Sequence, residues 1–156
     1  MPKTKNWEIT HLSIEEDLTS SAKVILCQRL DSLLASISSY FSEINEENLH
    51  QVRISLRRVR YSMELFIKCF NRKKYLGFYK IVSSLQDISG SVRDLDVLKQ
   101  NLKYFWSDNK PSKKNINFNK VDENKNLLQS NLKLELMKFI HSKELKEFKK
   151  LINHHT

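Results

Sequence analysis

Apolar residues recur every three or four positions along most of this chain, the spacing of helices that bury one face. The first series follows Ser13, where the sequence SIEE puts Glu16 three residues after a serine and so matches a capping box. The apolar residues that recur at helical spacing are Leu18, Ala22, Ile25, Leu26, Leu30, Leu33, Leu34, Ile37 and Tyr40. No stretch alternates apolar and polar residues as a strand would, so the pattern predicts helices alone.

Four further helices are predicted after this one. They cover about 46–71, 73–106, 121–141 and 142–152. Asn45 or Glu46 restarts the chain into the second helix, and Ser142 caps the short fifth one. The third helix is expected to bury Tyr75, Phe78, Tyr79, Val82, Leu85, Ile88, Val92, Leu95, Leu98, Leu102 and Phe105. The apolar positions of the fourth are Leu127, Leu128, Leu132, Leu134, Leu136, Phe139 and Ile140.

These elements predict an all-α fold, an antiparallel four-helix bundle with long helices plus a short C-terminal helix. Residues 1–12 look like a loose N-terminal leader, and residues 13–156 are expected to form a single helical-bundle domain. Within it, the polar, Asn- and Lys-rich segment at about 107–120 is predicted to be a loop. A chain of 156 residues is long enough to bury a core without disulfides or metals.

The composition of the chain also predicts where in the cell the protein is found. Cys27 and Cys69 lie in helical patterns without CxxC spacing, which is typical of reduced, buried thiols in a cytosolic protein. The N-terminus has no apolar signal-peptide region, and no apolar run approaches the roughly 20 residues of a membrane span. We therefore expect a soluble, cytoplasmic protein with no membrane contact.

The positive charge of the chain is concentrated in one segment. The formal net charge is +9, and the segment from His50 to Lys80 carries +8 of it. Its nine basic residues are Arg53, Arg57, Arg58, Arg60, Lys68, Arg72, Lys73, Lys74 and Lys80, and its only acidic residue is Glu64. A solvated helix face is usually interleaved with acidic residues, whereas this segment is not. The excess indicates a polyanionic partner.

A helical wheel at roughly 100° per residue sorts these bases into a narrow stripe along the second helix. The stripe consists of His50, Arg53, Arg57, Arg60, Glu64 and Lys68, and Arg58 lies off it. One apolar face flanks the stripe on the core side, and Ile54, Tyr61 and Leu65 form a second one almost opposite. The stripe should therefore line a groove.

Crowded guanidinium groups between apolar walls repel one another, so something must offset their charge. Internal carboxylates of the third helix are one source, with Asp87, Asp94 and Asp96 as candidates. A bound anion is the other, because guanidinium matches phosphate oxygens in bidentate geometry.

His50 allows two interpretations. It is either a hydrogen-bonded structural residue or a group that protonates beside a bound phosphate and donates from both ring nitrogens. A metal site is not expected, because His11, His141, His154 and His155 show no ligand spacing.

The segment from Leu85 to Leu102 is the second informative stretch. Gly90 sits in the middle of a predicted helix, where it costs roughly 1 kcal/mol relative to alanine, and a close approach of another helix would explain it. Arg93 and Asp94 read as a buried ion pair. Either Asp94 orients an arginine of the stripe, or Arg93 also reaches the ligand.

These two stretches together resemble the CHAD family, the conserved-histidine α-helical domains. The family's His-x-x-Arg-x-x-x-Arg-Arg-x-Arg-Tyr helix is matched by His50, Arg53, Arg57, Arg58, Arg60 and Tyr61. Its following Leu-Gln…Gly…Arg-Asp-x-Asp-Val-Leu segment is matched by Leu85, Gln86, Gly90, Arg93, Asp94, Asp96, Val97 and Leu98. The resemblance runs from about Ser13 to Ile152.

The resemblance implies a non-catalytic module that binds inorganic polyphosphate in a basic channel, without a cofactor, and that associates in some cells with polyphosphate granules. Central contacts would come from His50, Arg53, Arg57 and Arg60, with support from Arg58, Lys80 and Arg93. Typical members contain two such bundles facing each other, whereas this chain has one motif block and resembles a half-domain. A homodimer would restore a two-walled channel.

Two other functions stay open at this point. The basic groove is also compatible with a nucleic acid or with an acidic protein segment. The aromatic residues near the stripe are expected on core faces, which disfavours a stacking platform for bases. An enzyme is not expected, because the sequence has no Gly-rich phosphate loop and no plausible catalytic triad.

Overall fold

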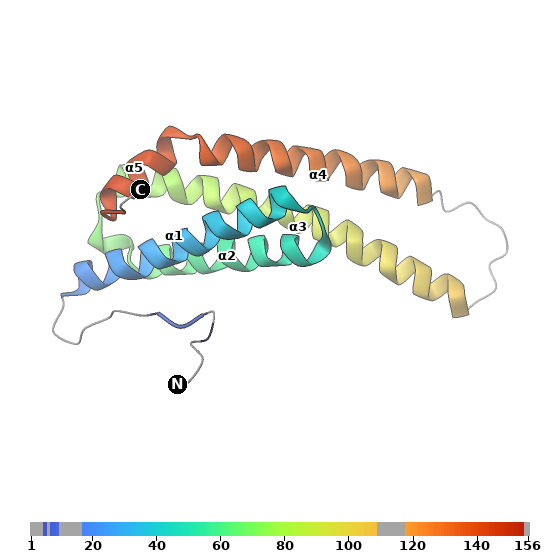
Figure 1. Cartoon of the computed structure of the whole chain (residues 1–156), viewed down its shortest axis with the longest axis horizontal. Helices are drawn as coiled ribbons and strands as arrows, with labels where there is room; N and C mark the ends of the chain where they lie inside the picture. Colours follow the sequence, from blue (N-terminus) through green and yellow to red (C-terminus); the bar gives the residue numbers. More distant parts are fainter. Residues whose placement is uncertain (1–4, 6, 10–16, 109–117, 155–156) are drawn as a thin grey trace.

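The computed structural model describes residues 5, 7–9, 17–108 and 118–154, and within these ranges the chain is helical with no strand (Figure 1). The elements are α1 (Leu18–Ser42), α2 (Glu46–Leu65), the 3₁₀ turn η1 (Ile67–Cys69), α3 (Arg72–Asp108), α4 (Phe118–Ile140) and α5 (Lys143–Leu151). The predicted all-α fold with a short C-terminal helix is confirmed. Residues 109–117, which fall in the predicted loop, lie outside the described residues.

Side-chain caps define where three helices begin. The Asn45 side chain accepts a hydrogen bond from the backbone N–H of Asn48 at 2.7 Å, and Ser142 accepts one from Leu145 at 3.2 Å. Both predicted starts are confirmed. The predicted capping box at 13–16 lies outside the described residues, and the described part of α1 begins after Asp17, whose carboxylate caps it.

The second helix is shorter than predicted. It ends at Leu65 instead of continuing to residue 71, and the chain passes through η1 before α3 begins. Phe66 stays buried although it lies beyond the helix, so the apolar spacing continues through the break. The Tyr75 hydroxyl donates to the backbone carbonyl of Met63 at 2.6 Å, which satisfies an acceptor in the last turn of α2.

The helices pack as two antiparallel pairs around one core. α1 pairs with α2, and the long α3 packs against α2 on one side and against α4 and α5 on the other (Figure 1). The rings of Phe78 and Phe148 stack with centroids 3.9 Å apart, which fastens α5 onto α3. The core receives buried residues from each of α1 to α5.

The α3–α4 pair extends past the turn that joins α1 to α2 (Figure 1). Two positions of α3 that were predicted to face inward are exposed. Leu98 is 44% exposed and Phe105 is 57% exposed. Their predicted burial was wrong, because helical spacing identifies a common face but does not tell whether another element covers it.

Both cysteines are free and half-buried. The Cys27 thiol donates to the backbone carbonyl of Ile152 at 3.2 Å, and burial, assisted by the negative charge of Asp31, raises its pKa. Across the described ranges, no helix has the length and apolar character needed to cross a bilayer.

Candidate functional site

The basic stripe of α2 faces α3, and Arg60 is its most firmly held member. Arg60 Nε donates to Glu64 Oε1 at 3.1 Å and to the Tyr79 hydroxyl at 3.3 Å, and its Nη1 donates to Gln86 Oε1 at 3.4 Å. The Tyr79 hydroxyl in turn donates to Glu64 Oε1 at 2.6 Å. This network ties α2 to α3 and fixes the guanidinium in one orientation.

The same contacts shift the ionisation of both charged partners. The pKa of Arg60 is raised, mainly by its hydrogen bond with Tyr79 and then by Glu64. The pKa of Glu64 is lowered, mainly by the Tyr79 hydroxyl, with Arg60 adding to the effect. Arg60 therefore stays charged but already has a carboxylate of its own.

A small pocket lies beside this network, between α2 and α3. It has a volume of about 110 Å³ and is lined by His50, Arg53, Ile54, Arg57 and Gln86. The side chains of His50, Arg53 and Arg57 form no hydrogen bond or ion pair with any other residue that the structure describes. The pocket thus collects two guanidinium groups that no described carboxylate neutralises.

Gln86 supplies the wall of the pocket that comes from α3. Its Oε1 accepts from Arg60, so its amide nitrogen is the end left to donate to a ligand. Gln86 belongs to the second sequence motif but was not among the predicted site residues. The motif position was its only sequence signal.

The three predicted carboxylates do not neutralise the stripe. Asp87 and Asp94 are exposed and form no ion pair within the described chain. Asp96 is only 3% exposed, but its partner is Lys125 of α4, whose Nζ lies 2.6 Å from Asp96 Oδ1. Within the described ranges, these three carboxylates therefore do not offset the repulsion between Arg53 and Arg57.

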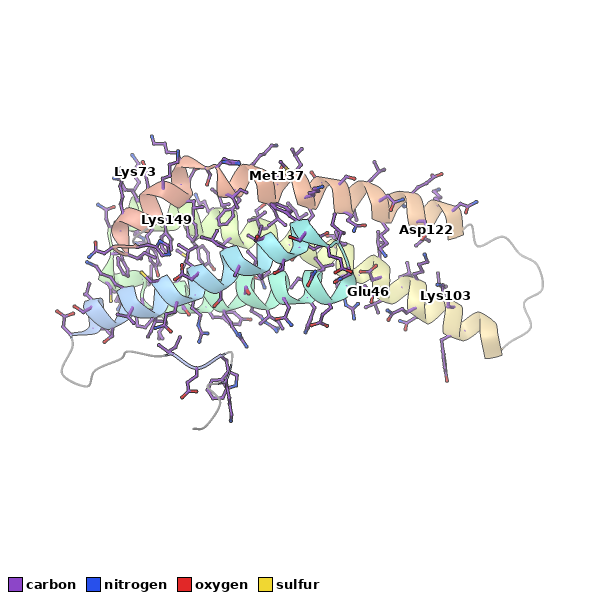
Figure 2. The ribbon with its side chains drawn as sticks, viewed as in Figure 1. Glu46, Lys73, Lys103, Asp122, Met137 and Lys149 are labelled. Carbon is purple, nitrogen blue, oxygen red and sulfur yellow. The ribbon has the colours of Figure 1, made fainter. Side chains whose placement is uncertain are left out.

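Arg93 does not form the predicted buried pair with Asp94. Its Nη1 lies 3.6 Å from Glu46 Oε2, and both side chains are partly exposed. Glu46, labelled in Figure 2 at the start of α2, also accepts from Gln100 Nε2 at 3.1 Å. The prediction was wrong because the partner of Arg93 comes from the neighbouring helix.

Gly90 is not explained by a close approach of another helix. A Cβ atom built on Gly90 meets nothing within 4 Å, so that prediction was also wrong. Gly90 follows Gln86 by one turn and precedes Arg93 by one turn, so all three share one face of α3. The missing side chain leaves open space beside the groove.

The outer edge of the groove is uncovered. Tyr61 is 57% exposed and Leu65 is more exposed still, so the second apolar face predicted for α2 forms an open rim and not a buried wall. The expectation that the aromatic residues near the stripe lie on core faces was wrong for Tyr61. Lys80 is exposed on α3 and is not part of the pocket lining.

Arg58 lies on the other flank of α2. It lines a separate cavity between α1 and α2 and is absent from the lining of the α2–α3 pocket. The structure thus brings His50, Arg53 and Arg57 together and holds Arg60 next to them through Gln86. It pairs Arg93 with Glu46 outside the pocket lining and separates Arg58 from the group.

The fold and this site define a helical-bundle protein with an incompletely neutralised basic groove between two antiparallel helices. Residues 4–103 match the model of the CHAD domain, a span that includes α2 and most of α3. The chain therefore belongs to the CHAD domain family. Neither the curated proteins nor the solved structures contain a significant match to it.

Proposed function

We propose that this chain is a non-catalytic module that binds inorganic polyphosphate in the groove between α2 and α3. One observation carries the proposal: Arg53 and Arg57 line a pocket together with His50, and no carboxylate of the described chain pairs with either arginine. Two adjacent guanidinium groups repel each other. A phosphate chain bound between them would attract both groups and so offset this repulsion.

The spacing of the cations suits a linear polymer of phosphates. Successive bases on the stripe lie three or four residues apart, or about 4.5–6 Å along the helix axis. A chain lying along α2 would meet Arg53 and Arg57 in turn, with Arg60 held ready by Glu64 and Tyr79. Gln86 would donate from α3, His50 would donate when protonated, and Lys80 and Arg93 would attract the polymer at the edges.

Charge reversal tests this proposal. The double variant Arg53→Glu, Arg57→Glu should lose retention on immobilised polyphosphate while its far-ultraviolet circular dichroism stays unchanged. The control Lys146→Glu, Lys150→Glu makes the same change in net charge at exposed positions of α5 and should keep binding. Equal retention by both variants would contradict the groove as the site. Wild-type retention should also fall steeply with salt, since bound phosphates release counterions.

Single-stranded nucleic acid is a second candidate, favoured by the exposure of Tyr61. This ring lies one turn after Arg57, where a base could stack beside a neutralised phosphate. Competition at matched charge separates the two ligands. If Tyr61→Ala weakens binding of oligothymidylate and the oligonucleotide displaces polyphosphate, nucleic acid becomes the better assignment. Polyphosphate binding that is indifferent to this substitution supports the first proposal.

The open rim of the groove supports a proposal about assembly. Two copies could face each other across a bound phosphate chain and so provide the second wall, whereas without the polymer their basic segments would repel. The molar mass measured by light scattering should double when polyphosphate is added. A mass of one chain under both conditions would rule this out. As a polyphosphate binder the protein would act in the cytoplasm, at polyphosphate granules where these form.

A further inference from the structure

The flank of α2 that faces α1 carries a second cavity, which the polyphosphate groove does not use. Its volume of about 330 Å³ is three times that of the groove pocket and falls at the lower end of small-molecule sites, roughly 300–1,000 Å³. It is lined by Ser32, Ala35, Ser36, Ser39, Asn48, Gln51, Ser55 and Arg58. Six of the eight lining residues carry a hydroxyl or an amide group, and one, Arg58, is a cation.

Some of these polar side chains are hydrogen-bonded to the backbone, and others have no partner in the described chain. The Ser36 hydroxyl donates to the Leu33 carbonyl, and Asn48 Nδ2 donates to the carbonyls of Ser39 and Glu43. Ser55, by contrast, is only 8% exposed as a residue, and its hydroxyl forms no hydrogen bond with any residue in the described ranges. The hydroxyl oxygen is not itself fully buried, so it is open to a ligand that enters the cavity.

Two arginines lie near enough at this flank to influence each other, although only Arg58 lines the cavity, and neither forms an ion pair within the described ranges. Arg58 forms no ion pair with the described chain, and it follows Ser55 by three residues, so both face the same side of α2. Arg29 lies one turn before Ser32 on α1, and its Nη2 donates to the carbonyl of Trp7 at 3.3 Å, whereas its buried Nε has no hydrogen-bond partner within the described ranges. Burial lowers the pKa of Arg29, and the positive charge of Arg58 lowers it further. An anion placed here would relieve that repulsion.

We propose that this cavity is a separate site for a small phosphate ester with a hydroxylated body, of the sugar phosphate class. Arg58 and the Ser55 hydroxyl would bind the phosphate group, since charged donors and hydroxyls both favour its oxygens. Ser32 and Ser39, together with the side-chain carbonyl of Gln51, would meet the hydroxyls of the body. Linear polyphosphate has no such hydroxyls, so the polar wall distinguishes this site from the groove.

Neighbouring arginines provide the test. Glucose 6-phosphate is titrated calorimetrically into the wild-type protein, with glucose and inorganic phosphate as comparison ligands. Arg58→Gln should weaken glucose 6-phosphate binding about tenfold or more, the expected loss for a charged hydrogen bond. Ser55→Ala should weaken it several-fold, and Arg57→Gln should leave it unchanged. For polyphosphate the ranking should reverse, with Arg57→Gln harmful and Arg58→Gln neutral.

Three results would overturn the proposal. They are no saturable binding of glucose 6-phosphate, equal binding by wild type and Arg58→Gln, and equal affinity for glucose 6-phosphate and inorganic phosphate. The last result would show that the hydroxylated body is not recognised. Since the two cavities lie on different flanks, loss of polyphosphate binding by the groove would leave this test intact.

Discussion

Replacing Gly90 by alanine should stabilise the protein. Glycine inside a helix is less favourable than alanine by about 0.8–1.0 kcal/mol, because glycine loses more backbone freedom on folding. A Cβ at Gly90 meets no atom within 4 Å, so no clash offsets the gain. The free energy of unfolding should rise by about 1 kcal/mol, and the midpoint of thermal unfolding by about 2–4 °C for a chain of this size.

Gly77 provides a matched control in the same helix. It also has open space around its Cβ position, and it lies about 180° from Gln86 around α3, away from the groove. Gly77→Ala should therefore stabilise the protein by a similar amount. Urea unfolding with both variants gives the comparison, and the slope of the transition should not change.

A larger side chain should affect polyphosphate binding when it is placed at Gly90 but not when it is placed at Gly77. Gly90→Leu would extend a side chain from the turn next to Gln86 and should weaken polyphosphate binding, whereas Gly77→Leu should not. Destabilisation by either alanine variant would refute the open geometry. Equal polyphosphate affinity for the two leucine variants would refute the idea that Gly90 keeps the groove clear.

Three further predictions concern other polar contacts of the fold. Lys125→Met should lower the free energy of unfolding in urea by about 3 kcal/mol, because it leaves the buried Asp96 carboxylate unpaired, and adding Asp96→Asn should recover part of the loss. Tyr79→Phe should make the free energy of unfolding less dependent on pH in the acid range, because it removes the hydrogen bond that lowers the pKa of Glu64. The native pKa of Glu64 lies below its ordinary value of 4.5, so its stabilising contribution is present above that pH and is lost as the pH falls through the native pKa. Cys27 should react with iodoacetamide more slowly than a cysteine in an unfolded peptide at pH 8, since burial raises its pKa, and equal rates would contradict this.

Features set by nearby residues could be predicted from the sequence. The caps at Asn45 and Ser142 depend on hydrogen bonds within three residues. The sequence identified Ser142 as a cap and gave Asn45 as one of two possible starts of the second helix. The alignment of Arg53 and Arg57 on one face of α2 follows from helix geometry alone. The break after Leu65 was missed because Phe66 continues the apolar spacing although it has left the helix.

Features that depend on a second helix could not be predicted in the same way. The partners of Arg93 and Asp96 come from α2 and α4, and the motif contains nearer, misleading acids such as Asp94. The exposure of Tyr61 and Leu98 depends on where the neighbouring helices end or turn away. A single-helix wheel shows that residues share a face, but not what that face contacts.

The position of α2 between the groove and the second cavity has an electrostatic consequence. A helix with its side chains is about 10–12 Å thick, which is only slightly more than the screening length of roughly 8 Å at physiological salt. Anions held on its two flanks would therefore still repel each other. Each ligand should lower the affinity for the other by the same factor, and this antagonism should grow in dilute buffer and vanish in concentrated salt.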